Sequence, residues 1–264
     1  MEKKHPIPEE IKTRIKILLA DDDFINQKVI AGILRRLGYN VDIFSNGKDA
    51  VKALEQTSYD LVLMDCQMPE MDGFKATEEI RNPDSKVINH KVPVIALTGD
   101  ATEGEIIKFK NAGMNDFLSK PVKPPELSTV IEKWLFAHEP LQEEPSPDQI
   151  TGEGEVLDQS ILKNTFLDDT EMMSKILNDY LEYIPDKITG LKKAFDNGDT
   201  SSVRNQAHTL KGSSGNIGAT AIQNIFDQIK VAGEIGNLSG VDSLLLELDE
   251  QIVKLKKAIS ELEI

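Results

Sequence analysis

The chain has 264 residues, 39% of them hydrophobic and 28% charged, so we expect a globular protein with more than one core. Its formal net charge of −15 argues against direct binding to nucleic acid or to a membrane surface, because both require clustered Lys and Arg. The sequence has no apolar run that could span a bilayer, no secretory signal and a single cysteine, Cys66, so we expect a soluble, cytoplasmic protein with protein partners.

After an N-terminal extension of residues 1–14, residues 15–138 alternate between short β-rich runs and helical patterns. We expect strands at residues 15–19, 41–44, 61–64, 94–97 and 116–118. Helices should begin near Phe24, Asn46, Gly73, Thr102 and Pro124, several of them after a plausible N-cap residue. This alternation predicts an α/β fold with a five-stranded, parallel, doubly wound sheet.

Residues 139–155 are polar and rich in Pro and Gly, which predicts a flexible linker. From 156 to 264 the strand pattern is absent and apolar residues recur at helical spacing. Breaks at 197–199 and 236–237 predict antiparallel helices, so we expect a separate all-α domain that forms a four-helix bundle. Pro185 should kink its helix or cost it a hydrogen bond.

Polar side chains follow the predicted strands at the edge where open parallel sheets bind ligands. In chain order they are Asp21, Asp22 and Asp23, then Asp65 and Gln67, then Thr98, and last Lys120. Taken singly, the acidic triplet is more often a helix N-cap, Lys120 a solvated lysine and Thr98 an ordinary strand residue. Together they suit a magnesium-assisted phosphoryl acceptor, in which one carboxylate attacks phosphorus and cations neutralise the transferred oxygens.

The first half resembles the response-regulator receiver domain in four stretches that occur in the family's order. These are Ile-Leu-Leu-Ala-Asp-Asp-Asp from Ile17, Met-Asp-Cys-Gln-Met-Pro-Glu-Met-Asp-Gly from Met64, Ala-Leu-Thr-Gly-Asp-Ala from Ala96 and Phe-Leu-Ser-Lys-Pro from Phe117. The resemblance implies a flavodoxin-like fold and Asp65 as the phosphoacceptor. It also implies a Mg²⁺ site made by Asp21, Asp22, Asp65 and the backbone carbonyl of Gln67.

The same resemblance implies that Thr98 and Lys120 contact the phosphoryl group and that Thr98 and Phe117 form a switch. Thr98 would move toward the phosphoryl oxygens and Phe117 would occupy the space that it leaves. Plain core packing is the alternative role of Phe117. We interpret Cys66 as a tolerated small residue, because neighbouring carboxylates raise a thiol pKa.

In the helical half, the predicted helix that contains His208 has a core stripe formed by Val203, Ala207 and Leu210. The other face, which we expect to see solvent, carries Arg204, His208, Lys211, Gly212 and Gly215. Its two glycines suggest a surface kept flat for a docking partner. A neutral imidazole can attack phosphorus, and Lys211 could attract the phosphoryl oxygens. A lone helical histidine is more often a solvated side chain, and His5, His90 and His138 receive that interpretation.

Residues 157–262 resemble the histidine phosphotransfer (HPt) domain. The matching segments are Ala-His-Thr-Leu-Lys-Gly-Ser-Ser from Ala207, Gly-Ala at 218–219 and Tyr-Leu-Glu-Tyr-Ile-Pro-Asp-Lys from Tyr180. The resemblance implies His208 as a second phosphoacceptor, assisted by Lys211.

These features predict a two-component phosphorelay protein. Asp65 would accept a phosphoryl group from a sensor histidine kinase, and His208 would exchange it with a receiver aspartate of this chain, or of another response regulator or phosphotransfer protein. We expect a carrier and not an enzyme, with at most slow self-dephosphorylation.

Other functions fit the sequence less well. A haloacid-dehalogenase-like phosphatase would use Asp21 and Asp23, but Ile25 replaces the expected Thr or Val, and Asp65 and Thr98 stay unexplained. A sensor-kinase dimerisation region would have an acidic residue and a nearby Pro after His208. A scaffold without phosphoryl chemistry conflicts with the complete acceptor set. The C-terminal segment of a hybrid sensor kinase stays open as an alternative.

Overall fold

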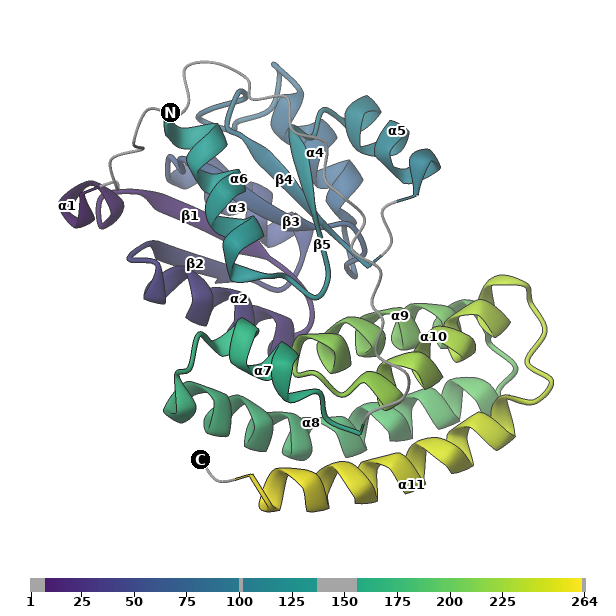
Figure 1. The fold of residues 1–264 in the computed structure, drawn as a ribbon. Helices are drawn as coiled ribbons and strands as arrows, with labels where there is room; N and C mark the ends of the chain where they lie inside the picture. The colour runs from purple at the N-terminus through teal and green to yellow at the C-terminus, as the bar shows by residue number, and fades with distance from the viewer. Residues whose placement is uncertain (1–7, 100–101, 137–155, 263–264) are drawn as a thin grey trace. The chain divides into compact units, whose positions relative to one another are not determined.

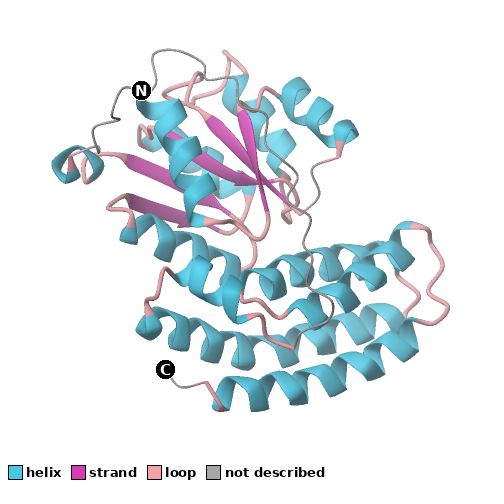
Figure 2. Cartoon of the chain, viewed as in Figure 1, coloured by secondary structure: helices cyan, strands magenta, loops and turns pink. Residues whose placement is uncertain are grey.

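The computed structural model describes residues 8–99, 102–136 and 156–262, and the chain divides into two compact units, Met1–Leu141 and Gln142–Ile264. The predicted linker, residues 139–155, lies outside the described residues. Strands occur in the first unit, and the described part of the second is helical (Figures 1 and 2).

The first unit is a five-stranded parallel sheet flanked by helices. Its strands are β1 (Lys16–Ala20), β2 (Asn40–Phe44), β3 (Leu61–Asp65), β4 (Val94–Thr98) and β5 (Asp116–Ser119). Every pairing is parallel and the strand order is β2-β1-β3-β4-β5. The chain order therefore reverses between β1 and β3, which is the position where doubly wound sheets bind ligands.

The helices of this unit are a short α1 (Glu9–Lys12), then α2 (Phe24–Arg36), α3 (Gly47–Gln56), α4 (Gly73–Arg81), α5 (Glu103–Ala112) and α6 (Pro124–Phe136). Side chains of Asp23, Asn46, Asp72 and Thr102 cap the starts of α2 to α5. Figure 1 shows α6 in front of the sheet.

Both faces of the sheet are buried, which explains why its central strands are continuous apolar runs. Alternate residues of each strand point to opposite faces. Those on one face pack with α3, α4 and α5 in a single core that includes Leu18, Val62, Ala96, Ile80 and Phe109. The predicted α/β class and the predicted five parallel strands are confirmed.

The second unit contains, among its described residues, a short helix α7 (Gln159–Phe166) and four long helices. These are α8 (Thr170–Asp196), α9 (Thr200–Asn216), α10 (Thr220–Glu234) and α11 (Val241–Ser260). The four long helices confirm the predicted bundle. Helix α8 runs through Pro185, which has no N–H to donate to the carbonyl of Leu181.

The α9–α10 turn and α7 were not predicted, although Gly218 has the positive φ (71°) that such a turn requires. No helix in the described ranges combines the length and the apolar character needed to cross a lipid bilayer.

Candidate functional site

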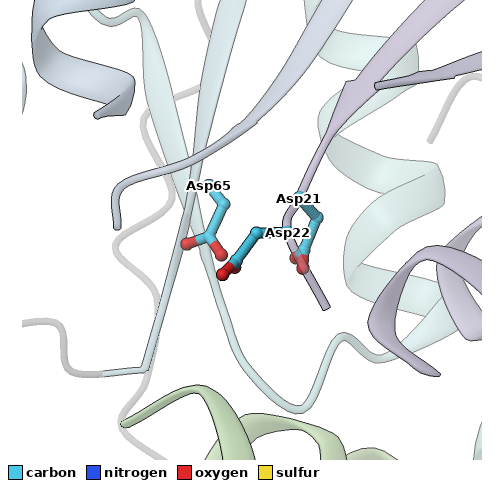
Figure 3. A group of neighbouring side chains, drawn as sticks. All are labelled: Asp21, Asp22 and Asp65. Carbon is cyan, nitrogen blue, oxygen red and sulfur yellow. The ribbon is translucent and has the colours of Figure 1, made fainter. Parts of the chain in front are cut away.

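Three carboxylates meet at the carboxyl edge of the sheet. Asp21 follows β1 directly and Asp65 is the last residue of β3, and these two strands are neighbours with Ala20 paired to Met64. One ligand oxygen from each of Asp21, Asp22 and Asp65 lies within 4.8 Å of the other two. Figure 3 shows the three carboxyl groups gathered in one place. The structure therefore brings together the predicted acidic residues of two strands.

The third residue of the acidic triplet has a separate structural role. Oδ1 of Asp23 accepts hydrogen bonds from the backbone N–H groups of Ile25 and Asn26 at 3.0 and 2.9 Å, so Asp23 is the N-cap of α2. Oδ1 of Asp21 accepts from the backbone N–H of Asp23 at 2.9 Å, which fixes the orientation of the Asp21 carboxylate.

A buried ammonium group lies among the carboxylates. Nζ of Lys120 is 2.7 Å from Oδ2 of Asp65 and 2.8 Å from Oδ2 of Asp21, and all three side chains are almost fully buried. Burial alone would lower the pKa of Lys120, but the charges of Asp21 and Asp65 outweigh it and raise that pKa. Lys120 therefore stays protonated at neutral pH.

The carboxylates are not fully neutralised by this lysine. Burial, and then the charge of Asp21, raise the pKa of Asp22 to about 7. Burial also raises the pKa of Asp65 to about 8, although Lys120 acts in the opposite direction. Three carboxylates beside one ammonium leave a deficit of positive charge when all are ionised.

The oxygen atoms of this group fit a hard divalent cation. Oδ1 of Asp22 is buried and has no hydrogen-bond partner among the described residues. Such an oxygen costs free energy unless a proton or a metal ion satisfies it. A cation that prefers oxygen ligands, such as Mg²⁺, would both contact this oxygen and supply the missing positive charge.

The remaining residues predicted for this site have different surroundings. The backbone N–H of Gln67 is 3.4 Å from Oδ1 of Asp65. Thr98 ends β4, next to β3, and is buried, with its hydroxyl 3.4 Å from Oε2 of Glu105. The partly buried ring of Phe117 packs against Phe109 with 6.0 Å between ring centroids.

Cys66 is buried beside Asp65. Burial, followed by the negative charge of Asp65, raises the pKa of its thiol well above the ordinary value. The thiol therefore stays protonated at neutral pH, which agrees with its interpretation as a small packing residue.

Gly73 is a site residue whose role sequence reasoning did not predict. A Cβ atom at Gly73 would lie 2.1 Å from the backbone oxygen of Asp65, so only glycine fits at the start of α4. The residue stands in the segment Met-Asp-Gly that follows Asp65, and this glycine next to the N-cap Asp72 was the available signal.

His208 lies in the middle of α9 and is partly exposed. The predicted core stripe is confirmed, since Val203, Ala207 and Leu210 are buried. The expectation that the whole face of His208 sees solvent is wrong at Gly212 and Gly215, which are both buried. A Cβ atom at Gly215 would lie 2.7 Å from Nε2 of Gln223, so this glycine allows a close approach of α10 instead of a flat outer surface.

Two contacts hold the segment around His208. Nζ of Lys211 forms an ion pair with Oδ1 of Asp227 on α10 at 2.7 Å. On the inner side, the buried hydroxyl groups of Tyr180 and Ser214 are 2.8 Å apart, which ties α8 to α9. The histidine is thus presented by a helix that is fixed on both sides.

A buried carboxylate beside a lysine at the sheet edge, and a helical histidine beside a lysine in a bundle, define the two kinds of phosphoryl carrier found in phosphorelay proteins. The comparisons with known families agree with that class. Residues 17–132 match the response regulator receiver domain and residues 175–262 match the Hpt domain, so the chain belongs to the proteins that join a receiver domain to an Hpt domain. A haloacid-dehalogenase-like phosphatase is not favoured by these matches.

Two curated relatives illustrate the similarity. Hybrid signal transduction histidine kinase B of Dictyostelium discoideum is 44% identical over 130 residues, which are 46% of this chain and 7% of that protein. Signal transduction histidine-protein kinase BarA of Escherichia coli strain K12 is 25% identical over 261 residues, which are 97% of this chain and 28% of that protein. The chain thus spans less than a third of the length of these relatives.

Among solved structures, the receiver domain of sensor histidine kinase PA1611 from Pseudomonas aeruginosa PAO1 is 42% identical. The match covers 47% of this chain and 98% of that one, with a TM-score of 0.43. That structure is described as having a magnesium ion coordinated in its active site cleft.

Proposed function

We propose that Asp65 accepts a phosphoryl group from the phosphohistidine of a sensor histidine kinase and that His208 carries phosphoryl groups to or from receiver aspartates. The receiver aspartate is Asp65 itself or one on another response regulator, and phosphotransfer proteins are further possible partners. The observation that carries this proposal is the contact of 2.7 Å between Lys120 Nζ and the Asp65 carboxylate, next to Asp21 and Asp22.

In the first step, an oxygen of the Asp65 carboxylate forms a bond to phosphorus while the bond from phosphorus to the kinase imidazole nitrogen breaks. Lys120 already contacts Asp65, so its ammonium stands where charge develops on the phosphoryl oxygens. Thr98, at the end of the adjacent strand, would donate its hydroxyl hydrogen to one of these oxygens.

Asp21, Asp22, Asp65 and the Gln67 backbone carbonyl would hold Mg²⁺ in this site. When bound, the cation supplies positive charge that favours the ionised carboxylates and neutralises phosphoryl oxygens. The support for this assignment is the buried Asp22 oxygen and the excess of carboxylates over ammonium groups.

In the second step, a neutral ring nitrogen of His208 forms a bond to phosphorus while the bond to the aspartate oxygen breaks. The aspartate leaves as a carboxylate, and the other ring nitrogen keeps its proton. The partial exposure of His208 supports this role, because the imidazole must meet a receiver site. Lys211, one turn away, would attract the phosphoryl oxygens.

We also propose that Thr98 and Phe117 convert phosphorylation into a change of surface. Thr98 would leave its contact with Glu105 for the phosphoryl oxygens, and the partly buried Phe117 ring would turn inward. The chain would act as a cytoplasmic carrier that is phosphorylated and then dephosphorylated in each transfer. The only reaction that it would catalyse by itself is slow hydrolysis of the acyl phosphate.

The test supplies the full chain with a small acyl phosphate and magnesium and compares wild type with Asp65→Asn and His208→Gln. We expect Asp65→Asn to lose the hydroxylamine-sensitive label of an acyl phosphate and His208→Gln to lose the acid-labile, base-stable label of a phosphohistidine. Asp84→Asn and His90→Gln are matched controls and should label as wild type does. Unchanged labelling in both site variants would refute the assignment.

The same assay distinguishes transfer within one chain from transfer between chains. Mixing phosphorylated His208→Gln chains with Asp65→Asn chains forces the exchange to be intermolecular. If wild type relays at a rate that does not change on dilution, the exchange occurs within one chain.

A further inference from the structure

The seam between α9 and α10 has a regular antiparallel register that three contacts define. Gly215 lies against Gln223, Lys211 pairs with Asp227, and a Cβ atom at Gly233 would lie 2.8 Å from the backbone nitrogen of Arg204. In each pair the two residue numbers add to 437 or 438. The same register places residue 230 opposite residue 208.

Residue 230 is a lysine that the proposed mechanism does not yet use. Lys230 is only 8% exposed, although long charged side chains are rarely buried without a purpose. Its Nζ lies 3.5 Å from Oε1 of Glu234, one turn further along α10. The register therefore places Lys230 opposite His208, and Glu234 holds its charged group.

Charged side chains lie along this seam on both helices. Arg204 and Lys211 flank His208 on α9, while Asp227 and Glu234 flank Lys230 on α10. Each of the two lysines is paired with one carboxylate of α10. A dianionic group at His208 would compete with those carboxylates for both ammonium groups, and charge-assisted hydrogen bonds to a phosphoryl group are strong.

We propose that Lys230 is a second cationic contact of the phosphoryl group on His208, contributed by the neighbouring helix and held in place by Glu234. This inference rests on the proposed role of His208. During transfer, the ring nitrogen forms a bond to phosphorus while the bond from phosphorus to the donor oxygen breaks. Lys230 and Lys211 then donate hydrogen bonds to the phosphoryl oxygens from two sides. The ordinary alternative is that the aliphatic stem of Lys230 packs in the seam while its ammonium serves only to pair with Glu234.

Lys230→Met separates these two roles, because methionine keeps an unbranched stem and removes the charge. In an Asp65→Asn background, the full chain is phosphorylated with phosphoramidate so that label on His208 is measured alone. We expect Lys230→Met to slow both this labelling and the transfer to a second chain by about tenfold, as for the loss of one charge-assisted hydrogen bond. Lys230→Arg should recover most of the rate.

Lys254→Met is the matched control, since Lys254 is an exposed lysine of α11. Circular dichroism and thermal melting show whether each variant is folded. A second readout is the NMR titration of the His208 ring, which should move to higher pH in Lys230→Met, because a nearby positive charge is removed. It should not move in Lys254→Met.

Equal rates and an unmoved titration in folded Lys230→Met would overturn this inference while leaving the role of His208 intact. A wild-type chain that carries no label on His208 would overturn the proposed function and this inference together.

Discussion

Asp22→Asn should stabilise the metal-free receiver domain and should remove most of the stabilisation that magnesium gives. In the metal-free protein, Asp22 ionises in a buried place beside Asp21, and its pKa is raised to about 7. The pKa of Asp22 is higher in the folded than in the unfolded state, so the protonated carboxyl favours folding at low pH. This contribution is lost as pH rises from about 4 to about 7, because the buried group must then ionise. Asparagine avoids this cost.

The size of the effect follows from the same shift. A rise of about three units in the pKa of Asp22 corresponds to a loss of at most about 4 kcal/mol of stability at pH 8. Contact with water and relaxation of the site make the actual loss smaller. We therefore expect metal-free Asp22→Asn to be more stable than wild type at pH 8 by roughly 1–3 kcal/mol. At pH 4 the two proteins should be nearly equal.

Magnesium should remove or reverse this difference. At a hundredfold excess over its dissociation constant, a ligand stabilises the folded state by about 2.7 kcal/mol, or roughly 8–14 °C in Tm for a domain of this size. Asp22→Asn lacks one ligand oxygen that has no other partner in the described structure, so most of that shift should be lost.

Differential scanning calorimetry of the full chain at pH 4 and pH 8, with chelator or with magnesium, measures these effects. The helical domain contains no such acidic group among its described residues, so its transition is an internal reference. Asp84→Asn, in an exposed position, should behave as wild type. Equal magnesium shifts in wild type and Asp22→Asn would refute this account of the site.

Two further predictions concern packing. Gly73→Ala should destabilise the receiver by about 2 kcal/mol or more in urea melts, because its Cβ would collide with the Asp65 backbone oxygen, while Gly104→Ala, with open space around it, should be neutral or slightly stabilising. Ser214→Ala should cost the helical domain roughly 0.5–1.5 kcal/mol because it removes the hydrogen bond between the buried hydroxyl groups of Tyr180 and Ser214, and Tyr180→Phe should show a similar loss; no loss in either variant would contradict the pairing.

The sheet could be predicted from the sequence because its central strands are buried on both faces and appear as apolar runs. The predicted ends are less accurate. Strands β1, β3, β4 and β5 each extend one residue beyond the prediction, and in β3 and β4 that residue is a polar residue of the site, Asp65 or Thr98. Hydrophobicity alone places such residues outside a strand.

The helical half shows what periodicity cannot supply. Periodicity correctly separated the buried stripe of α9 from the stripe that contains His208. It could not show which neighbouring helix borders this second stripe. Gly215 was therefore predicted to be part of an open surface, and periodicity alone did not relate Lys230 to His208. Both became interpretable only when the register of α9 against α10 was known.

The two proposed carriers differ in how they meet the same anionic group. The aspartate site is itself anionic, so a phosphoryl group can enter only when additional positive charge accompanies it, and Lys120 alone does not supply enough. At the proposed histidine site the cations are side chains of the protein, Lys211 and Lys230. They pair with Asp227 and Glu234 when no phosphoryl group is present. Magnesium concentration should therefore shift the distribution of phosphoryl groups toward Asp65, and neutralising Lys211 or Lys230 should shift it in the same direction by weakening the other carrier.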